Sequence, residues 1–487
     1  MEVSFQQQLA DAPWLLGLLE VLWIAFIFVY VVLQKRPPVA TLAWLLLLAS
    51  LPVVGLPIYA VFGPRRLERK RLRHALARES VGVTEAARRV REAATRLLLR
   101  AAQRQPGMDL ATLAVSCGEA APLPCETRLH TEGRDAHRAL LEAVSLAQHH
   151  IHLEYYIFEA GAFGRQLRDA LVARAGAGVE VRLLLDAVGS RPLRSLFLAP
   201  LISAGAEVAW FNPVSFALFR PWFVNFRTHR KIVVVDGSIG FTGGMNVSDD
   251  HDQAVHGDAA SRDTHLRIEG DAVAPLALVF LEDWAFATGR LVTGESYISA
   301  PTGRGSELLQ IVASGPDDDT FAIHKQMFAA IASARDRVWL TTPYFVPDES
   351  MTTALASAAM RGVDVRLLVP QRGDHAIVDA ASRSYFRELL QVGVRVWHYT
   401  PRFIHSKTLV VDWSIGQVGT ANFDNRSFRL NFEVVATFFS PGPIKQLAQH
   451  FQCDLQSARE LTISAEAATP PLRRLAEGAA RLFSPLL

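Results

Sequence analysis

The 487-residue sequence predicts an α/β protein with two duplicated α/β domains, each a central sheet flanked by helices, that share one active site and follow an N-terminal transmembrane helical hairpin. Three observations lead to this prediction. A polar string, HRKIVVVD at His229–Asp236, returns as HSKTLVVD at His405–Asp412. Short β-branched runs alternate with amphipathic stretches in both halves, as in βα repeats. Two long apolar stretches stand near the N-terminus, and each could cross a bilayer.

The N-terminal hairpin is predicted for residues 1–64, with spans at about 14–33 and 39–62. Each stretch is long enough to cross roughly 30 Å of hydrocarbon. The alternative is a cleaved secretory signal, but no Lys or Arg precedes position 35 to supply its basic region. Glu20 interrupts the first span, and we expect it near the membrane interface rather than as a paired carboxylate inside the membrane.

Residues 65–118 follow as a predicted helical linker that is basic and amphipathic. Six of its basic residues fall within 65–73, whereas the loop between the spans carries only Lys35 and Arg36. The positive-inside rule therefore favours a cytoplasmic catalytic part. The linker could bind anionic lipid headgroups or be a solvated helix of mixed charge, and the sequence leaves both open.

After the linker, the chain repeats one order of helix-like and strand-like segments. We predict a first domain at 119–296 and a second at 308–487, joined where Ser, Pro, Thr and Gly cluster near 297–307. The alternation of short apolar runs with amphipathic helices predicts a sheet covered by helices in each domain. The matching segments are 136–149 with 321–335, 151–158 with 338–345, 178–186 with 362–370, and 204–213 with 392–401.

The repeated string reads H-x-K-x4-D, and a G-x-x-N follows each copy. The copies lie 176 residues apart at the His, Lys, Asp and Asn alike. Only six of the 50 basic residues are Lys, so the placement of Lys in both motifs indicates that a compact ammonium is needed there. The candidate catalytic residues are His229, Lys231, Asp236, His405, Lys407 and Asp412, and the candidate substrate-binding residues are Asn246 and Asn422.

The motif suits chemistry at a tetrahedral anionic centre. Alternate residues of a strand point the same way, so each H-x-K places an imidazole and an ammonium on one face. Two such strands across a pseudo-two-fold axis would form an oxyanion pocket in which Lys and Asn stabilise charge without a metal. One His can attack phosphorus, while the other protonates the leaving alkoxide and later deprotonates the incoming hydroxyl. For Asp236 and Asp412 we favour a structural role beside this catalytic motif.

The two halves differ just before the motif, where a substrate would enter. The first motif begins sixteen residues after Pro213, but the second begins only four residues after Pro401. The insertion, around residues 216–226, is aromatic and flanked by arginine. It could be a buried lid, but next to a membrane hairpin we favour a loop that dips into the membrane interface.

Composition argues against several other functions. The net charge of +2 does not indicate a nucleic-acid binder. The three cysteines lack metal-ligand spacing, no H-E-x-x-H accompanies the motif, and no G-x-x-x-x-G-K loop is present in the sequence. We therefore expect neither a metal nor a cofactor.

These residues resemble the phospholipase D superfamily, whose mark is the duplicated H-x-K-x4-D followed by G-x-x-N. Within that superfamily the chain is similar to the bacterial cardiolipin synthases, and the resemblance covers nearly all of it. Besides the hairpin, the resemblance rests on IHLEYYIF (Ile151–Phe158), SRDTHLRIEG (Ser261–Gly270), TTPYFVPDES (Thr341–Ser350) and GTANFDNRSF (Gly419–Phe428).

The resemblance implies two phospholipase D-like domains and a ping-pong transfer between two phosphatidylglycerol molecules. The products would be cardiolipin and glycerol, and the intermediate a phosphatidyl-histidine. His229 would be the nucleophile and His405 the acid/base, although pseudo-symmetry makes these roles exchangeable. An acidic residue behind each imidazole is also implied, with Glu433 matching well and Asp263 as its first-half counterpart.

One departure from the family concerns the position after the first glycine of each G-x-x-N, here Gly244 and Thr420, where many relatives carry Ser. The implied setting is the bacterial inner membrane, with a multi-pass chain that contacts phosphatidylglycerol and other phospholipids. The alternatives are a phospholipase D that uses water, a phosphodiesterase acting on nucleic acid, and an inactive membrane scaffold. The acceptor lipid and the oligomeric state stay open.

Overall fold

The computed structural model describes residues 13–33, 38–62, 67–82, 84–101, 106–212, 226–467 and 469–487. The chain divides into two compact units, Met1–Glu68 with Ser215–Phe223, and Arg69–Val214 with Val224–Leu487. The predicted aromatic insertion lies outside the described residues except for Phe226. The domain boundaries drawn from the sequence remain predictions.

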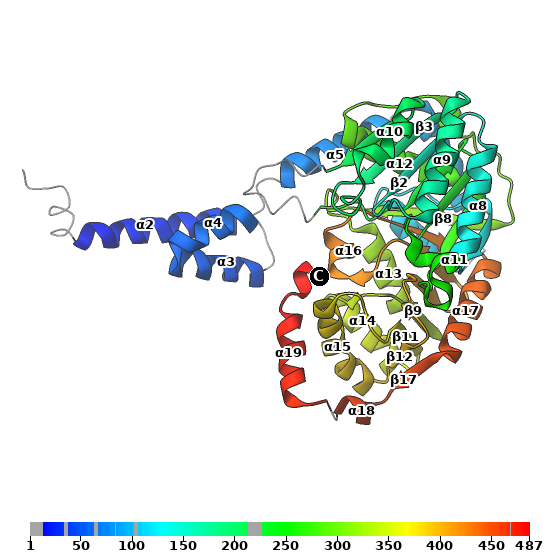
Figure 1. Cartoon of the computed structure of the whole chain (residues 1–487). Helices are drawn as coiled ribbons and strands as arrows, with labels where there is room; N and C mark the ends of the chain where they lie inside the picture. Colours follow the sequence, from blue (N-terminus) through cyan, green and yellow to red (C-terminus); the bar gives the residue numbers. More distant parts are fainter. Residues whose placement is uncertain are drawn as a thin grey trace, which may run out of the picture. The chain divides into compact units, whose positions relative to one another are not determined.

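The described residues of the first unit form helices α2 (Pro13–Val32), α3 (Pro38–Ser50) and α4 (Pro52–Phe62) (Figure 1). The second apolar stretch is thus two helices rather than one continuous span. Pro52 has no N–H to extend α3, and it begins α4 instead. In the part of the chain that the structure describes, no helix is both long and apolar enough to cross a membrane. The transmembrane part of the prediction is therefore not confirmed.

In the second unit, a single sheet runs through both halves of the repeat. Fifteen strands of the described chain pair in the order β17-β12-β11-β9-β13-β14-β16-β8-β1-β7-β6-β5-β2-β3-β4. The first-half strands are β1 (Leu123–His130), β2 (His150–Tyr155), β3 (Glu180–Asp186), β4 (Glu207–Phe211), β5 (Ile232–Val235), β6 (Ile239–Gly243) and β7 (His265–Gly270). The second-half strands are β8 (Glu307–Ser314), β9 (Arg337–Thr341), β11 (Asp364–Pro370), β12 (Arg395–Tyr399), β13 (Thr408–Val411), β14 (Ile415–Gly419), β16 (Glu433–Phe438) and β17 (Ala458–Leu461).

The two halves meet at β1 and β8, which pair antiparallel with Leu123 opposite Leu309. Outward from this seam, the first half runs β1-β7-β6-β5-β2-β3-β4 and the second runs β8-β16-β14-β13-β9-β11-β12. These seven positions match strand for strand, which confirms the predicted duplication; β17, beyond β12, has no counterpart among the described first-half strands. The motif-bearing strands β5 and β13 are buried and occupy equivalent places on either side of the seam.

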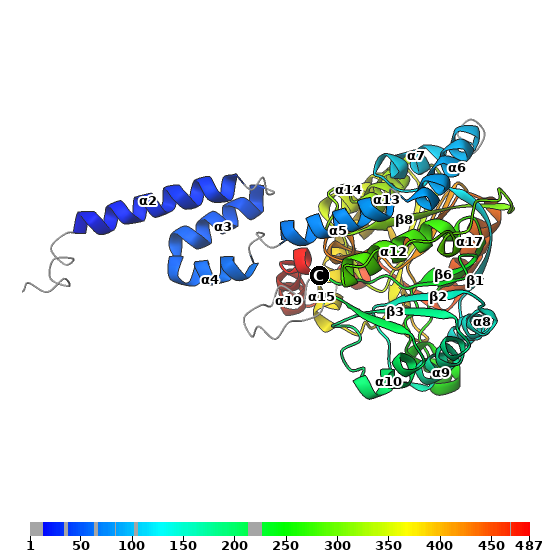
Figure 2. The same cartoon turned by 90° about the horizontal axis from the view of Figure 1, so that it is seen from above.

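Helices cover both faces of the sheet. In the first half, α8 (Gly133–Leu146), α9 (Ala162–Gly176) and α10 (Ser195–Ser203) lie on one face, and α12 (Val273–Thr288) lies on the other (Figure 2). The second half carries α13 (Ala322–Ser333), α14 (Glu349–Met360), α15 (Ala376–Gln391) and α17 (Pro441–Gln456), followed by α18 (Ile463–Ala467) and α19 (Pro471–Arg481). The predicted α/β class with helices on a central sheet is confirmed.

The predicted linker forms α5 (Leu67–Gly82), α6 (Glu85–Ala101) and α7 (Met108–Ser116). Its apolar side chains, such as Val90 and Met108, belong to the main hydrophobic core. On α5, His74 is buried between Asp283 at 2.9 Å and Asp317 at 2.8 Å. Burial alone would lower the pKa of His74, but the two carboxylates raise it to about 9. These residues of the linker are therefore an integral part of the second unit.

Candidate active site

Two crossing segments build the site between the motif strands. Residues that follow Asn422 cross to the first half, where Phe432 N donates to Arg227 O and His229 N donates to Phe432 O, both at 2.9 Å. Residues that follow Asn246 cross in the opposite direction. There Arg262 N donates to Phe403 O at 2.9 Å, and His405 N donates to Arg262 O at 2.7 Å.

This exchange gives each histidine a carboxylate from the other half. His229 Nδ1 lies 3.0 Å from Glu433 Oε2, and His405 Nδ1 lies 2.6 Å from Asp263 Oδ2. Both carboxylates are completely buried. The resemblance named Glu433 and Asp263 as the acids, and the structure brings both of them against the histidines.

The carboxylates remain ionised despite their burial. Burial alone would raise the pKa of Glu433, but His229 and Lys231 outweigh it and lower the value to about 2. His405 and Lys407 likewise hold the pKa of Asp263 well below its usual range. Each carboxylate can therefore accept the Nδ1 proton of its histidine, which leaves Nε2 available for chemistry.

Burial lowers the pKa of both histidines. That of His405 falls to about 4, where the charge of Lys407 adds to burial and Asp263 opposes both. The pKa of His229 is also lowered, mainly by burial, with Glu433 opposing. In the free protein at neutral pH the imidazoles are therefore neutral, and a bound phosphate anion would favour protonation of one of them.

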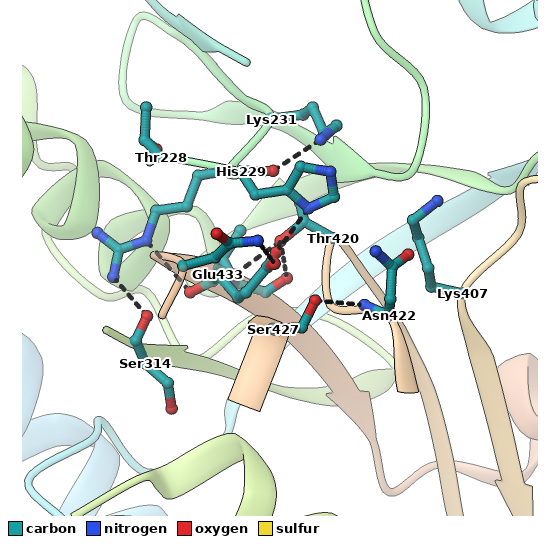
Figure 3. A network of polar contacts seen from close by, with 12 residues as sticks. Thr228, His229, Lys231, Ser314, Lys407, Thr420, Asn422, Ser427 and Glu433 are labelled. Atoms are coloured by element: carbon teal, nitrogen blue, oxygen red, sulfur yellow. Dashed lines mark hydrogen bonds and ion pairs between the residues drawn. The ribbon is translucent and has the colours of Figure 1, made fainter. Parts of the chain in front are cut away.

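Each motif lysine contacts the histidine two residues before it, and Figure 3 shows Lys231 near His229 and Lys407 near Asn422. Lys231 Nζ donates to His229 O at 2.7 Å, and Lys407 Nζ donates to His405 O. Burial lowers the pKa of Lys231 to about 7 and that of Lys407 to about 8. Two compact cations with spare donors beside an uncharged imidazole pair can stabilise an anionic phosphorus centre.

A cavity of about 620 Å³ opens onto this constellation. Its lining includes His229, His405, Asn246 and Asn422. Asn422 Oδ1 is buried and has no hydrogen-bond partner within the described chain. The structure therefore brings together both predicted His–Lys pairs, both asparagines and both acids.

Asp236 and Asp412 are placed elsewhere, at the far ends of β5 and β13. The carboxylate of Asp236 accepts backbone N–H groups from residues 148–150 at 2.8–2.9 Å. That of Asp412 accepts the same groups from residues 335–337 at 2.8–3.3 Å. Both residues have φ of +51°, in the left-handed region that Asp tolerates better than most residues. Their contacts fit the structural role that we favoured.

Sequence reasoning missed several residues around the histidines. Thr420 Oγ1 donates to Glu433 Oε2 at 2.5 Å, and the Tyr156 ring lies 5.1 Å from that of His229. The buried His251 ring lies 5.6 Å from the His405 ring. The family resemblance singled out the position of Thr420 but not its contact with Glu433, whereas nothing in the sequence singles out Tyr156 or His251.

One group of described residues could hold a metal ion. Ligand atoms of His251, Asp263 and His405 all lie within 4.8 Å of one another. Two of these three residues already bond to each other, so a metal would compete with the Asp263–His405 hydrogen bond. These three residues could bind an ion, but only at the expense of the hydrogen bond between Asp263 and the active-site His405.

These features define a phosphodiester-transfer protein: a duplicated α/β sheet that carries two opposed histidine–carboxylate pairs, two buried lysines and two asparagines. A family described as "Cardiolipin synthase, PLD-like domain" matches residues 140–259 and 327–455. A second, "Phospholipase_D-nuclease N-terminal", matches residues 21–64. The chain belongs to the cardiolipin synthase family of phospholipase D-like proteins.

Similar proteins extend over nearly the whole chain. A cardiolipin synthase of Alkalihalophilus pseudofirmus is 38% identical over 484 residues, which is 97% of this chain and 95% of the relative. One of Geobacillus kaustophilus is 40% identical over 479 residues, or 97% and 94%. The solved phosphatidylserine synthase of Haemophilus influenzae shares the fold, with a TM-score of 0.57, 14% identity and coverage of 78% of this chain and all of that one.

Proposed function

We propose that this protein is a cardiolipin synthase that transfers a phosphatidyl group between two phosphatidylglycerol molecules. Cardiolipin and glycerol are the products, and a phosphatidyl-histidine is the intermediate. The observation that carries the proposal is the pair of histidines in one cavity, each hydrogen-bonded through Nδ1 to a buried carboxylate of the opposite half. The near-complete match to bacterial cardiolipin synthases supports the choice of substrate class.

The proposed reaction takes two displacements at phosphorus. Nε2 of one histidine bonds to phosphorus of the first lipid, and the bond to the glycerol oxygen breaks as the other histidine donates a proton to it. That second histidine then removes the proton from a hydroxyl of the second lipid. The new oxygen bonds to phosphorus and the N–P bond breaks, which restores both side chains.

The remaining groups would act on charge rather than on protons. Lys231, Lys407, Asn246 and Asn422 would stabilise the equatorial oxygens of each transition state with N–H donors. Glu433 and Asp263 would keep each imidazole in the tautomer whose Nε2 faces phosphorus, and would stabilise the imidazolium when it forms. The proposed chemistry uses no metal and no cofactor.

We also propose that the N-terminal unit is a membrane hairpin in the bacterial cell membrane, with the catalytic unit on the cytoplasmic side. α2 exposes large apolar side chains on several sides, among them Leu18, Leu22, Phe26 and Val29, and exposed apolar surface of this extent marks a membrane or protein contact. The excess of basic residues at 65–73 supports the orientation. Protease protection in inverted membrane vesicles would test it.

Product analysis with phosphatidylglycerol vesicles tests the activity. Wild-type protein should yield cardiolipin and free glycerol by phosphorus NMR and thin-layer chromatography. His229→Ala and His405→Ala should yield neither, whereas His256→Ala, at an exposed histidine outside the cavity lining, should behave as wild type. Phosphatidic acid in place of cardiolipin would make the protein a hydrolase, and turnover by either active-site variant would contradict the paired mechanism.

A further inference from the structure

The cavity is not symmetric in charge, although its histidines are related by the repeat. Positions 176 residues apart in the repeat carry Arg227 and Phe403, and a second such pair is Asp250 and Arg426. All four side chains line the cavity. In each pair only one of the two residues is an arginine. Arg227 comes from the first half of the chain and Arg426 from the second.

Backbone hydrogen bonds join the chain segments that carry both arginines to the segment of His229. Arg227 O accepts from Phe432 N, and Phe432 O accepts from His229 N. Asn431, the residue before Phe432, donates its N–H to Arg426 O at 2.9 Å. We call Arg227 and Arg426 the cationic wall.

The equivalent bonds place Phe403 and Asp250 on the His405 side. Phe403 O accepts from Arg262 N, whose carbonyl accepts from His405 N. Ser261, the residue before Arg262, donates its N–H to Asp250 O at 2.7 Å. At these two repeat-related pairs, the arginines therefore belong to the His229 side and the phenylalanine and aspartate to the His405 side, although Asp424, which caps the helix that carries Arg426, also lines the cavity.

Arg227 is an unusual cation because its guanidinium is buried with few hydrogen-bond partners. Its side chain is 2% exposed, and within the described residues its Nε and Nη2 have no hydrogen-bond partner. Nη1 lies 3.5 Å from Asp186 Oδ1 and 3.2 Å from Asn212 O. Burial lowers its pKa, although Asp186 opposes this. Unpaired donors on a buried guanidinium are costly, and an anion with two oxygens in one plane would satisfy them.

The cavity also contains acidic groups, which limit where a second anion could sit. Asp374 accepts from Tyr344 Oη at 2.8 Å, near the exposed Arg372 at the mouth. Asp424 accepts from Ser427 N at 2.7 Å, and burial raises its pKa to about 6. Arg426 Nη1 in turn contacts Leu486 O at 3.5 Å. Among the described residues, the buried Nε and Nη2 of Arg227 remain without a hydrogen-bond partner.

We infer that the cationic wall binds the phosphodiester of the acceptor phospholipid, so that His229 is the acid/base and His405 carries the phosphatidyl group. This inference rests on the proposed function. The leaving glycerol is neutral, whereas the acceptor brings a phosphate only a glycerol unit away from its attacking hydroxyl. Attacking and leaving groups are in line at phosphorus, so the hydroxyl lies beside the histidine that takes its proton, opposite the nucleophile. These roles are the reverse of those that the resemblance implied.

A donor that needs no general acid tests the roles of the histidines. With a phosphatidyl p-nitrophenyl ester, His229→Ala should release about one p-nitrophenol per enzyme in a burst, with the phosphatidyl group on the His405 peptide by mass spectrometry. His405→Ala should give no burst. A burst in His405→Ala with the label on His229 would overturn the assignment. If wild type gave neither burst nor cardiolipin, the proposed function itself would fail.

A comparison of two acceptors tests the cationic wall. Arg227→Gln and Arg426→Gln should slow cardiolipin formation about 10- to 100-fold, with most of the effect in KM for the lipid acceptor. Exchange of labelled glycerol into phosphatidylglycerol, which uses a neutral acceptor, should fall far less and reports that the variants are folded. Arg227→Lys should recover part of the loss. Arg429→Gln, on the same short helix as Arg426 but outside the cavity lining, is the matched control. Equal losses in both reactions would contradict the acceptor role.

Discussion

Replacing Glu433 by glutamine probes the contact on which the proposed chemistry depends most. The side chain is completely buried, and it accepts from His229 Nδ1 at 3.0 Å, from Thr420 Oγ1 at 2.5 Å and from Asn431 Nδ2 at 3.3 Å. Glutamine has nearly the same shape but no charge. It can still accept one hydrogen bond from the imidazole, so the change removes the electrostatic support while leaving the packing largely intact.

The expected loss follows from the distance. At 3.0 Å and an effective dielectric constant of about 20, Coulomb's law gives about 5 kcal/mol between the carboxylate and a protonated His229. Because about 1.4 kcal/mol corresponds to a factor of ten in rate, kcat should fall by about 10³ to 10⁴. The pKa of Lys231, already lowered to about 7 by burial, should fall further, since Glu433 is the main group that supports its charge. The same argument at 2.6 Å predicts a loss at least as large for Asp263→Asn.

The assay is the initial rate of cardiolipin formation in vesicles of fixed composition, normalised to folded protein by circular dichroism. Glu119→Gln is the control, because Glu119 is a buried carboxylate paired with Arg78 at 2.6 Å and lies outside the cavity lining. It should keep most of the activity. If folded Glu433→Gln kept more than about a tenth of the wild-type kcat, the carboxylate could not be supplying the stabilisation that we calculate from its position.

Three further predictions concern other parts of the unit. Since the lowered pKa values of Lys231 and Lys407 are about 7 and 8, kcat/KM should decline as the pH rises through this range and the ammonium groups deprotonate; a flat profile to pH 9 would contradict their role as cations. Asp412→Ala should lower the free energy of unfolding in urea by roughly 2–4 kcal/mol, because its hydrogen bonds to the backbone N–H groups of 335–337 are lost. The activity per folded molecule should be unchanged. Asp412→Asn should have a smaller effect, because asparagine keeps an acceptor and tolerates positive φ. A Cβ at Gly244 would overlap the Asp263 carboxylate, so Gly244→Ala should displace it from His405 and reduce cardiolipin formation about 10- to 100-fold, whereas Thr420→Ser should have little effect; normal activity of Gly244→Ala would show that Asp263 can move without cost.

Much of this architecture could be predicted because the repeat is written in local patterns. The alternation of apolar runs with amphipathic helices predicted the strand and helix order of both halves. The H-x-K spacing was expected to place His and Lys on one face of a strand, but β5 and β13 begin only after the lysines, at Ile232 and Thr408. Glu433 and Asp263 were reached through the family resemblance. Their partners were not predictable, because Glu433 serves a histidine 204 residues away and Asp263 serves one 142 residues away. Such pairings depend on crossing segments whose path no local pattern specifies.

The continuous sheet was also beyond local reasoning. Nothing in the sequence of β1 or β8 says that their free edges pair with each other rather than being covered by loops. The apolar N-terminal stretches were recognised from composition, and Pro52 is the local signal for the division of the second one into α3 and α4 at Leu51. The aromatic insertion before His229 could be proposed only from the unequal spacing of the two halves.

The two halves of the site share their reacting groups and differ in the residues around them. The repeat places an imidazole, an ammonium and an amide on each side of phosphorus, and both proposed displacements use these groups. Within that frame, the position that is Thr420 in one half is Gly244 in the other: the hydroxyl donates to Glu433, whereas the missing side chain makes room for Asp263 to reach His405 at 2.6 Å. The Asp263 carboxylate thus lies closer to its histidine than the Glu433 carboxylate does, at 2.6 Å against 3.0 Å. In both displacements of the proposed mechanism one histidine bonds to phosphorus and the other carries protons, and we propose that the differences at Gly244, Arg227 and Asp250 decide which histidine takes which role.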